Sequence, residues 1–240
     1  MKNWILMVIF FAVMIGVNAL GGTGHINGQS QQEISDKLTV LFTPDGYVFS
    51  IWGLIYVLVG IWLIIQLLRV GKHEELSQRK VYLFLGTCVF NVLWLLTWHY
   101  EIFWLAQLMM IALLINLIVL YMAYPKGDKH FGGRLPFSLY LGWISVATIA
   151  NMAYTLKHYD VSLGIGEVPG TIGLLIVALL LCIATLYARR DQFYALVFVW
   201  AIIGIGTVNE ATSLVITAYI CAAIIAVAVV ASFIQQRRLA

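Results

Sequence analysis

The sequence predicts an all-α integral membrane protein of about eight transmembrane helices, and three observations support this prediction. Of its 240 residues, 62% are hydrophobic and only 10% are charged, against about a quarter charged in an ordinary soluble domain. Apolar stretches long enough to cross a bilayer follow one another along the chain. Lysine and arginine are distributed very unequally between the connections that separate these stretches.

The apolar stretches lie between clusters of charged and turn residues, and most have the length of about 17 to 25 residues that a bilayer requires. The seventh is short. We place them near 4–22, 47–70, 80–98, 102–124, 135–157, 170–188, 193–209 and 212–234. Most connections are brief, so successive helices are expected to be antiparallel neighbours.

Basic residues gather on one side of the predicted membrane. The other side holds only Lys37 and Lys157. The remaining twelve are Lys2, Arg69, Lys72, Arg79, Lys80, Lys126, Lys129, Arg134, Arg189, Arg190, Arg237 and Arg238. Because basic loops resist translocation, this split predicts that both termini face the cytoplasm, in what we expect to be a bacterial cytoplasmic membrane. The net charge of +3 then reflects orientation, and no nucleic-acid partner is expected, since no basic and aromatic interleaving occurs.

Two segments leave alternatives open. The first apolar stretch follows Lys2 and ends near small residues, so a cleaved signal peptide is an alternative to a transmembrane helix. The longest connection, 23–46, is polar and glycine-bearing, and it is either a lid over a ligand site or an unstructured tether.

Several functional classes lack the residues that they need. Pumps normally use carboxylates or histidines inside the membrane, and retinal proteins use a lysine within a helix; neither is predicted here. No nucleophile and base pairing, glycine-rich phosphate loop or metal-ligand spacing is present. The three cysteines fall singly inside predicted helices. We therefore predict no catalytic residue and no metal site.

Aromatic and amide side chains are the remaining candidates. At about 1.5 Å per residue, Trp52, Asn91 and Asn151 lie about 8, 10 and 9 Å below the outer ends of their helices, and Trp143 about 21 Å below. Such a layer can hold a flat apolar molecule by stacking and a few hydrogen bonds. The candidate ligand-binding residues are Trp52, Tyr56, Asn91, Trp94, Trp143 and Asn151.

Other interpretations apply to part of the aromatic and amide set. Trp98, Tyr100 and Trp104 have the position of an aromatic belt at the outer interface, and we assign them to it. Asn91 and Asn151 could equally provide hydrogen bonds between helices, worth about 0.6 kcal/mol each.

Three motifs carry a resemblance to a known family. The run TPDGYVFSIWGLIYVLVG from Thr43 to Gly60, the run FNVLW from Phe90 to Trp94, and LPFSLYLGWISVATIANMAYTL from Leu135 to Leu156 are similar in order and spacing to motifs of the TspO/translocator family, also called TspO/MBR or tryptophan-rich sensory proteins. Tyr47 stands where that family has tryptophan, and Asp45 stands in its proline pair.

The resemblance implies a TspO-like five-helix membrane domain over 1–158, followed by a three-helix membrane extension over 159–240. It also implies a pocket under the outer loop that binds a porphyrin or haem, in a sensory or regulatory role, and members of the family are commonly homodimers. No cofactor is certain. The alternatives are a small-molecule transporter, completed by the last three helices, and a membrane protein that degrades porphyrin. The expected partners are the lipid bilayer and a hydrophobic small-molecule ligand.

Overall fold

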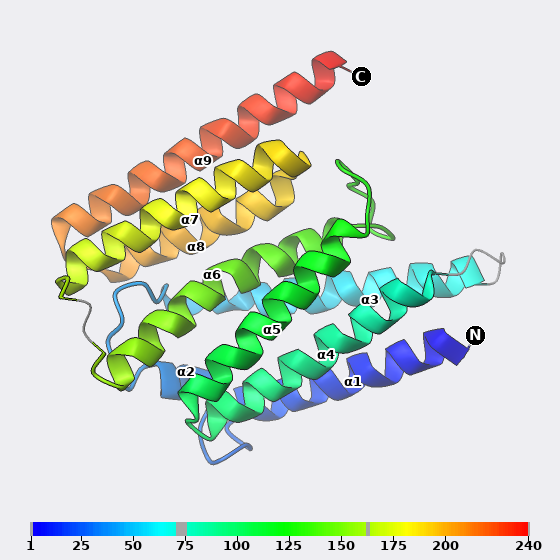
Figure 1. Cartoon of the computed structure of the whole chain (residues 1–240), viewed down its shortest axis with the longest axis horizontal. Coiled ribbons are helices and arrows are strands. Elements are labelled where there is room, and N and C mark those ends of the chain that lie inside the picture. The colour runs from blue at the N-terminus through cyan, green and yellow to red at the C-terminus, as the bar shows by residue number, and fades with distance from the viewer. Residues whose placement is uncertain (1, 71–75, 162–163, 240) are drawn as a thin grey trace. The chain divides into compact units, whose positions relative to one another are not determined.

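The computed structural model describes residues 2–70, 76–161 and 164–239, with side chains up to 236 (Figure 1). Lys72, counted above among the basic residues, lies outside this range, as do the side chains of Arg237 and Arg238. The described residues form helices joined by turns and contain no strand. The helices are α1 (Lys2–Gly22), α2 (Gln31–Ser35), η1 (Gly46–Ser50), α3 (Ile51–Val70), α4 (Gln78–His99), α5 (Phe103–Met122), α6 (Leu135–His158), α7 (Glu167–Arg189), α8 (Gln192–Val208) and α9 (Thr212–Leu239).

The predicted all-α membrane fold is confirmed. Among the described residues, seven helices are long and apolar enough to cross a membrane. The eighth apolar helix, α8, has 17 residues and corresponds to the short seventh stretch of the prediction. Helices α2 and η1 have five residues each; α2 belongs to the long connection, and η1 leads directly into α3.

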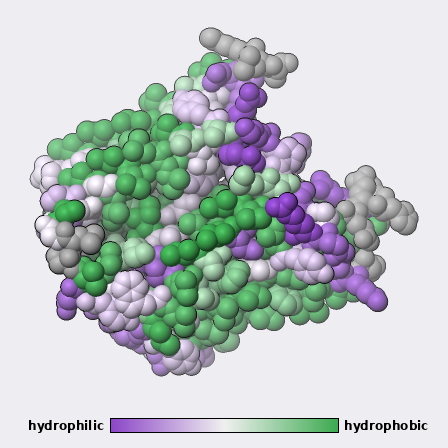
Figure 2. Space-filling model, in the orientation of Figure 1, coloured by the Kyte–Doolittle hydropathy of each residue, from purple (hydrophilic) through white to green (hydrophobic). Residues whose placement is uncertain are grey.

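Large apolar side chains are exposed along these helices. Val227, Leu68 and Leu180 are 69%, 63% and 63% exposed, and Figure 2 shows such side chains as broad green areas over the helices. Water would make this surface costly, at about 25 cal/mol for each Å² of apolar area. The chain is therefore an integral membrane protein, with lipid as the solvent of these faces.

The chain divides into two compact units, and each is described by itself. Unit 1 comprises Met1–Leu38 and Gly53–Phe137, and unit 2 comprises Thr39–Trp52 and Ser138–Ala240. Within unit 1, α4 packs against α1 and α5. Its core is aromatic, since the buried Trp62 of α3 stacks on Phe84 of α4 at 5.1 Å between ring centroids and meets Phe137 edge-on at 5.1 Å.

Unit 2 is built on the mutual packing of α7, α8 and α9, which lie side by side in Figure 1. Helix α6, from Ser138 onward, packs closely on α8 because Gly142 has no side chain. A Cβ at Gly142 would lie 2.9 Å from the carbonyl oxygen of Tyr194 and 3.0 Å from Cβ of Val197. Asp191 caps α8 by accepting a bond from the Tyr194 N–H, and it also accepts one from the Ser138 hydroxyl at 2.6 Å.

The predicted division at residue 158 differs from the boundaries of these compact units. Most of α6 belongs with α7, α8 and α9 in unit 2. The compact units do not test whether 1–158 folds independently, so the two predicted domains stay a prediction.

The long connection is folded, so its interpretation as an unstructured tether is wrong. Ser30 and Glu33 form a capping box at the start of α2, with each side chain bonded to the other residue's backbone N–H. Ile34 and Phe42 are buried at 0% and 1% exposure. The hydrogen bonds that cap the start of α2, together with the burial of these two apolar side chains, give the segment a definite structure.

Each half of this segment is held within its own unit. In unit 1, Lys37 forms an ion pair with Glu101, and the Asn27 side chain donates to the His99 carbonyl at 2.8 Å. In unit 2, Lys157 donates to the carbonyl of Thr39 at 2.6 Å, and Asn209 donates to that of Leu41 at 2.9 Å. That the segment is a lid stays a prediction.

Candidate ligand-binding site

Four aromatic rings meet in unit 2 where η1 and the start of α3 lie against α6. The ring of Trp143 contacts Phe49 at 5.6 Å and Trp52 at 6.1 Å between centroids, and Trp52 also contacts Tyr140 at 5.8 Å. Their interplanar angles of 75° to 84° are edge-to-face, an arrangement that aromatic pairs favour. Tyr140 and Trp143 are three residues apart on α6, so they share one face of the helix. We call these four residues the aromatic cluster.

The indole N–H of Trp143 is the polar atom of the cluster without a partner. Trp143 is 2% exposed, and no acceptor among the described residues bonds to its Nε1. An indole nitrogen can only donate a hydrogen bond. A buried donor that makes no hydrogen bond costs about 1–3 kcal/mol. The arrangement can therefore supply three things to a flat ligand, namely aromatic faces, an apolar surrounding and one hydrogen-bond donor.

Amide side chains meet in unit 1 between α1 and α4. Asn91 is fully buried, and its Oδ1 accepts a hydrogen bond from Nδ2 of Asn18 at 2.7 Å. The side chain of Asn91 also interacts with the hydroxyl group of Tyr56 on α3. Trp94 follows Asn91 on the same helix, is buried, and packs against Trp98 at 6.5 Å between centroids. Asn91 thus joins helices, as one of its two interpretations expected, and this does not exclude a ligand contact.

Asn151 lies on α6, eight residues after Trp143, which corresponds to about 12 Å along the helix. It is 5% exposed, and its backbone carbonyl accepts the hydroxyl of Thr155 at 2.8 Å. The structure thus brings Trp52 together with Trp143, and Tyr56 together with Asn91. A shared role of all six candidate residues in binding one ligand stays a prediction.

Three residues of these contacts were not among the predicted site residues. Phe49 and Tyr140 complete the aromatic cluster, and Asn18 is the partner of Asn91. Asn18 carried a visible signal, since it is an amide near the end of a long apolar stretch. Tyr140 also did, because it precedes Trp143 by one helical turn. Phe49 carried none, since only the folded η1 brings it to α6.

Two of the three residues assigned to the aromatic belt have the exposure that it requires, and their place in it stays a prediction. Tyr100 and Trp104 are 59% and 46% exposed, as side chains at an interface should be. Trp98 is 6% exposed and packs edge-on against Phe103 at 5.1 Å, so its assignment to the belt is wrong. Trp98 lies one residue before the end of α4, but its face of that helix points into unit 1.

Comparison with known proteins gives one finding. The chain matches a family model described as "TSPO-like protein" over residues 4–231. That match extends beyond the motifs quoted above and includes α7, α8 and most of α9. No curated protein and no solved structure matches the chain significantly.

Proposed function

The chain belongs to the TSPO-like protein family, and from this membership and the aromatic cluster we propose that it binds a flat hydrophobic molecule within the membrane, in a sensory or regulatory role. The ligand class we propose is a porphyrin or another tetrapyrrole. Trp52, Tyr56, Asn91, Trp94, Trp143 and Asn151 remain the candidate ligand contacts, and the proposal is centred on Trp143. We further propose that the outer segment over 23–46 covers the ligand and that the protein acts as a homodimer.

The unpartnered N–H of Trp143 is the observation that supports this proposal most strongly. A side chain kept for packing alone could be a phenylalanine, which has no donor to leave unsatisfied. Trp143 retains its donor at 2% exposure, in contact with the rings of Phe49 and Trp52. A ligand oxygen that accepted this bond would remove the cost of the buried donor.

The aromatic cluster also suits a tetrapyrrole better than a compact polar solute, because a tetrapyrrole has a flat aromatic face that such rings can contact. Edge-to-face rings present both ring edges and ring faces, and each aromatic contact contributes about 0.5–1.5 kcal/mol beyond area burial. The carboxylates on a porphyrin rim are acceptors of the kind that an indole N–H requires. Stacking and one directed bond would together orient the macrocycle.

Binding by the purified full chain tests the proposal. Protoporphyrin, haem, a sterol and a flat uncharged aromatic compound are titrated in turn, and indole fluorescence is followed. We expect saturable quenching by the tetrapyrroles. Quenching by none of them would contradict the proposed function.

Two further measurements on the same sample separate the proposed role from its alternatives. A sensor should bind porphyrin without moving it into liposomes and without changing its absorbance over time. Porphyrin uptake would identify a transporter, and time-dependent loss of absorbance would identify an enzyme that degrades the pigment.

A further inference from the structure

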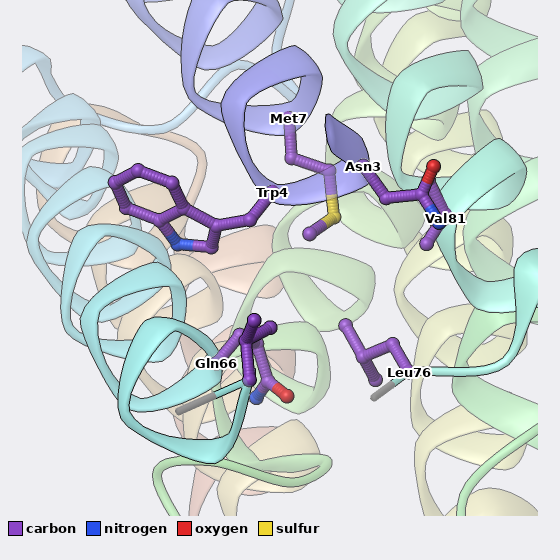
Figure 3. A pocket seen from close by; sticks show the side chains of 7 residues that line it. Asn3, Trp4, Met7, Gln66, Leu76 and Val81 are labelled. Carbon is purple, nitrogen blue, oxygen red and sulfur yellow. The ribbon is translucent and has the colours of Figure 1, made fainter. Parts of the chain in front are cut away.

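A small cleft opens in unit 1 where α1 and α4 begin and α3 ends. Figure 3 shows Trp4 and Met7 of α1 facing Gln66 and Leu76 across it. Its lining residues are Asn3, Trp4, Met7, Gln66, Val70, Leu76 and Val81. The lining is therefore mixed, with amides and an indole beside aliphatic side chains.

Two polar groups of the cleft are left without a partner in the described part of unit 1. Gln66 is 2% exposed and donates from Nε2 to the carbonyl of Gly132 at 3.0 Å, but its Oε1 accepts no bond from a described residue. The amide of Asn3 makes no hydrogen bond to a described residue either. Trp4 is satisfied, since its Nε1 donates to the carbonyl of Leu63 at 2.8 Å. The cleft thus offers one amide acceptor and one complete amide to a ligand.

Basic residues stand next in sequence to lining residues of this cleft on three helices. Lys2 precedes the lining residue Asn3, Arg69 precedes Val70, and Arg79 and Lys80 precede Val81. Arg69 already donates to the carbonyl of Gly132 at 2.9 Å, and Lys80 lies over the ring of Tyr124, 4.2 Å from its centroid, and interacts with Asp128. Lys2 and Arg79 are therefore the basic residues that we assign to the cleft. Asp128 is already bonded to His130 and to the backbone N–H of Arg134. Lys72, Glu74 and Glu75 of the sequence fall outside the described residues.

The ends of the helices add to this potential. Helices α1 and α4 both begin at the cleft, and neither has an acidic residue in its first turn. The Ser77 side chain makes no capping bond to α4. Unbonded N–H groups and the helix dipole make such N-termini favourable for an anion.

We propose that this cleft binds the headgroup of an anionic phospholipid. The phosphate would lie near the two helix N-termini, Lys2 and Arg79, and the Gln66 Oε1 would accept a bond from a headgroup hydroxyl. Exposed apolar side chains continue from the cleft along the same helices, with Ile5 on α1, Leu68 on α3 and Tyr82 on α4 at 48%, 63% and 67% exposure. These side chains would lie against the acyl chains, which a free phosphate does not have.

Retention of phospholipid by the purified full chain tests this proposal. The protein is reconstituted with phosphatidylglycerol and phosphatidylcholine in equal amounts, and the lipids that remain bound are counted by native mass spectrometry. We expect phosphatidylglycerol to be retained preferentially. Equal retention of both lipids would overturn the proposal.

Paired variants test the location. Replacing both Lys2 and Arg79 by glutamine should weaken phosphatidylglycerol retention by roughly 5-fold to 30-fold, because each basic residue near a membrane surface contributes about 1 kcal/mol to binding anionic lipid. Replacing the exposed Lys126 and Arg190 removes the same charge elsewhere and should leave retention unchanged. Equal losses in the two double variants would show general surface attraction and overturn the cleft as the site.

Two additional measurements keep the result interpretable. Asn3→Leu leaves the net charge intact and should still reduce phosphatidylglycerol retention, because it removes the unpartnered amide; unchanged retention would contradict the assigned headgroup contact. Inorganic phosphate at millimolar concentration should not displace the lipid. Displacement by phosphate would identify a free-anion site and contradict the lipid proposal.

Discussion

The side chain of Asn18 on α1 donates a hydrogen bond to that of Asn91 on α4, with 2.7 Å between Nδ2 and Oδ1. The same Asn18 nitrogen also bonds the carbonyl of Met14 at 2.8 Å. This contact ties the first helix to the core of unit 1, where Met7 and Met14 are buried at 2% and 1% exposure. A helix packed in this way has a structural role of its own, which favours the transmembrane interpretation of α1 over the signal-peptide alternative.

Breaking the Asn18 and Asn91 contact should therefore weaken unit 1. Asn18→Leu and Asn91→Leu should each lower the thermal stability of the full chain in detergent, and the double variant should lose less than the sum of the two. We expect a coupling of about 0.6 kcal/mol, the average for hydrogen bonds between transmembrane helices. Additive losses would show that the two amides do not stabilise the protein together.

The close approach of α6 and α8 depends on Gly142. Gly142→Ala should destabilise the protein by about 1–3 kcal/mol, because the added methyl group would meet the Tyr194 carbonyl at 2.9 Å. Gly173→Ala in α7 is the matched control, since a Cβ there has no neighbour within 4 Å. It should leave stability unchanged or raise it by less than about 1 kcal/mol. Thermal unfolding of both variants distinguishes close packing from general helix propensity.

Acid should destabilise the connection between α5 and α6. Burial raises the pKa of Asp128, but hydrogen bonds from the backbone and ring of His130 and from the Arg134 N–H outweigh it, so the pKa is lowered. Stability from these bonds is therefore present above the unfolded pKa of about 3.9 and is lost as pH falls through the lower folded value. Asp128→Asn should be less stable near neutral pH and should lack this acid-dependent loss in thermal melts between pH 6 and pH 3. A parallel pH dependence in the two proteins would contradict the assignment.

The twelve-to-two distribution of basic residues predicts the orientation. A cysteine at Gln29 should be labelled by an impermeant thiol reagent in intact cells, and a reporter fused after Ala240 should be active only in its cytoplasmic form. The native Cys88, Cys182 and Cys221 are buried, so the reagent should label them little. Labelling of the introduced cysteine only after permeabilisation would reverse the proposed topology.

Hydrophobic length made the helices predictable, because a bilayer imposes almost the same requirement on every span. The α8 helix, with 17 residues, is at the lower limit of this length and was still recognisable as an apolar stretch. The direction in which each side chain points was much harder to predict. Trp98 lies at the end of α4 and Trp104 at the start of α5, yet one is 6% exposed and the other 46%. Distance from a helix end gives depth alone, whereas burial depends on which neighbouring helix each face meets.

The candidate site shows the same limit. The depth argument placed Trp52, Asn91 and Asn151 at one level, and Trp143 farther from the end of its helix, at about 21 Å. The structure instead brings Trp143 against Trp52 at 6.1 Å, because η1 and the start of α3 reach α6. A single sequence holds no signal for that tertiary contact, nor for the unpartnered state of the Trp143 N–H.

The most direct test of the proposed function is the affinity of the Trp143→Phe variant for protoporphyrin, measured beside the wild-type chain and Trp104→Phe. The wild-type protein should bind saturably, and Trp143→Phe should bind about 2- to 12-fold more weakly, the equivalent of one hydrogen bond of about 0.5–1.5 kcal/mol. Its unliganded stability should change little, because the packing lost with the smaller ring opposes the removal of a buried donor that has no described partner. Trp104→Phe, at an exposed belt position, should bind as the wild type does. Equal affinity in all three proteins would contradict the assignment of Trp143 as the ligand's hydrogen-bond donor.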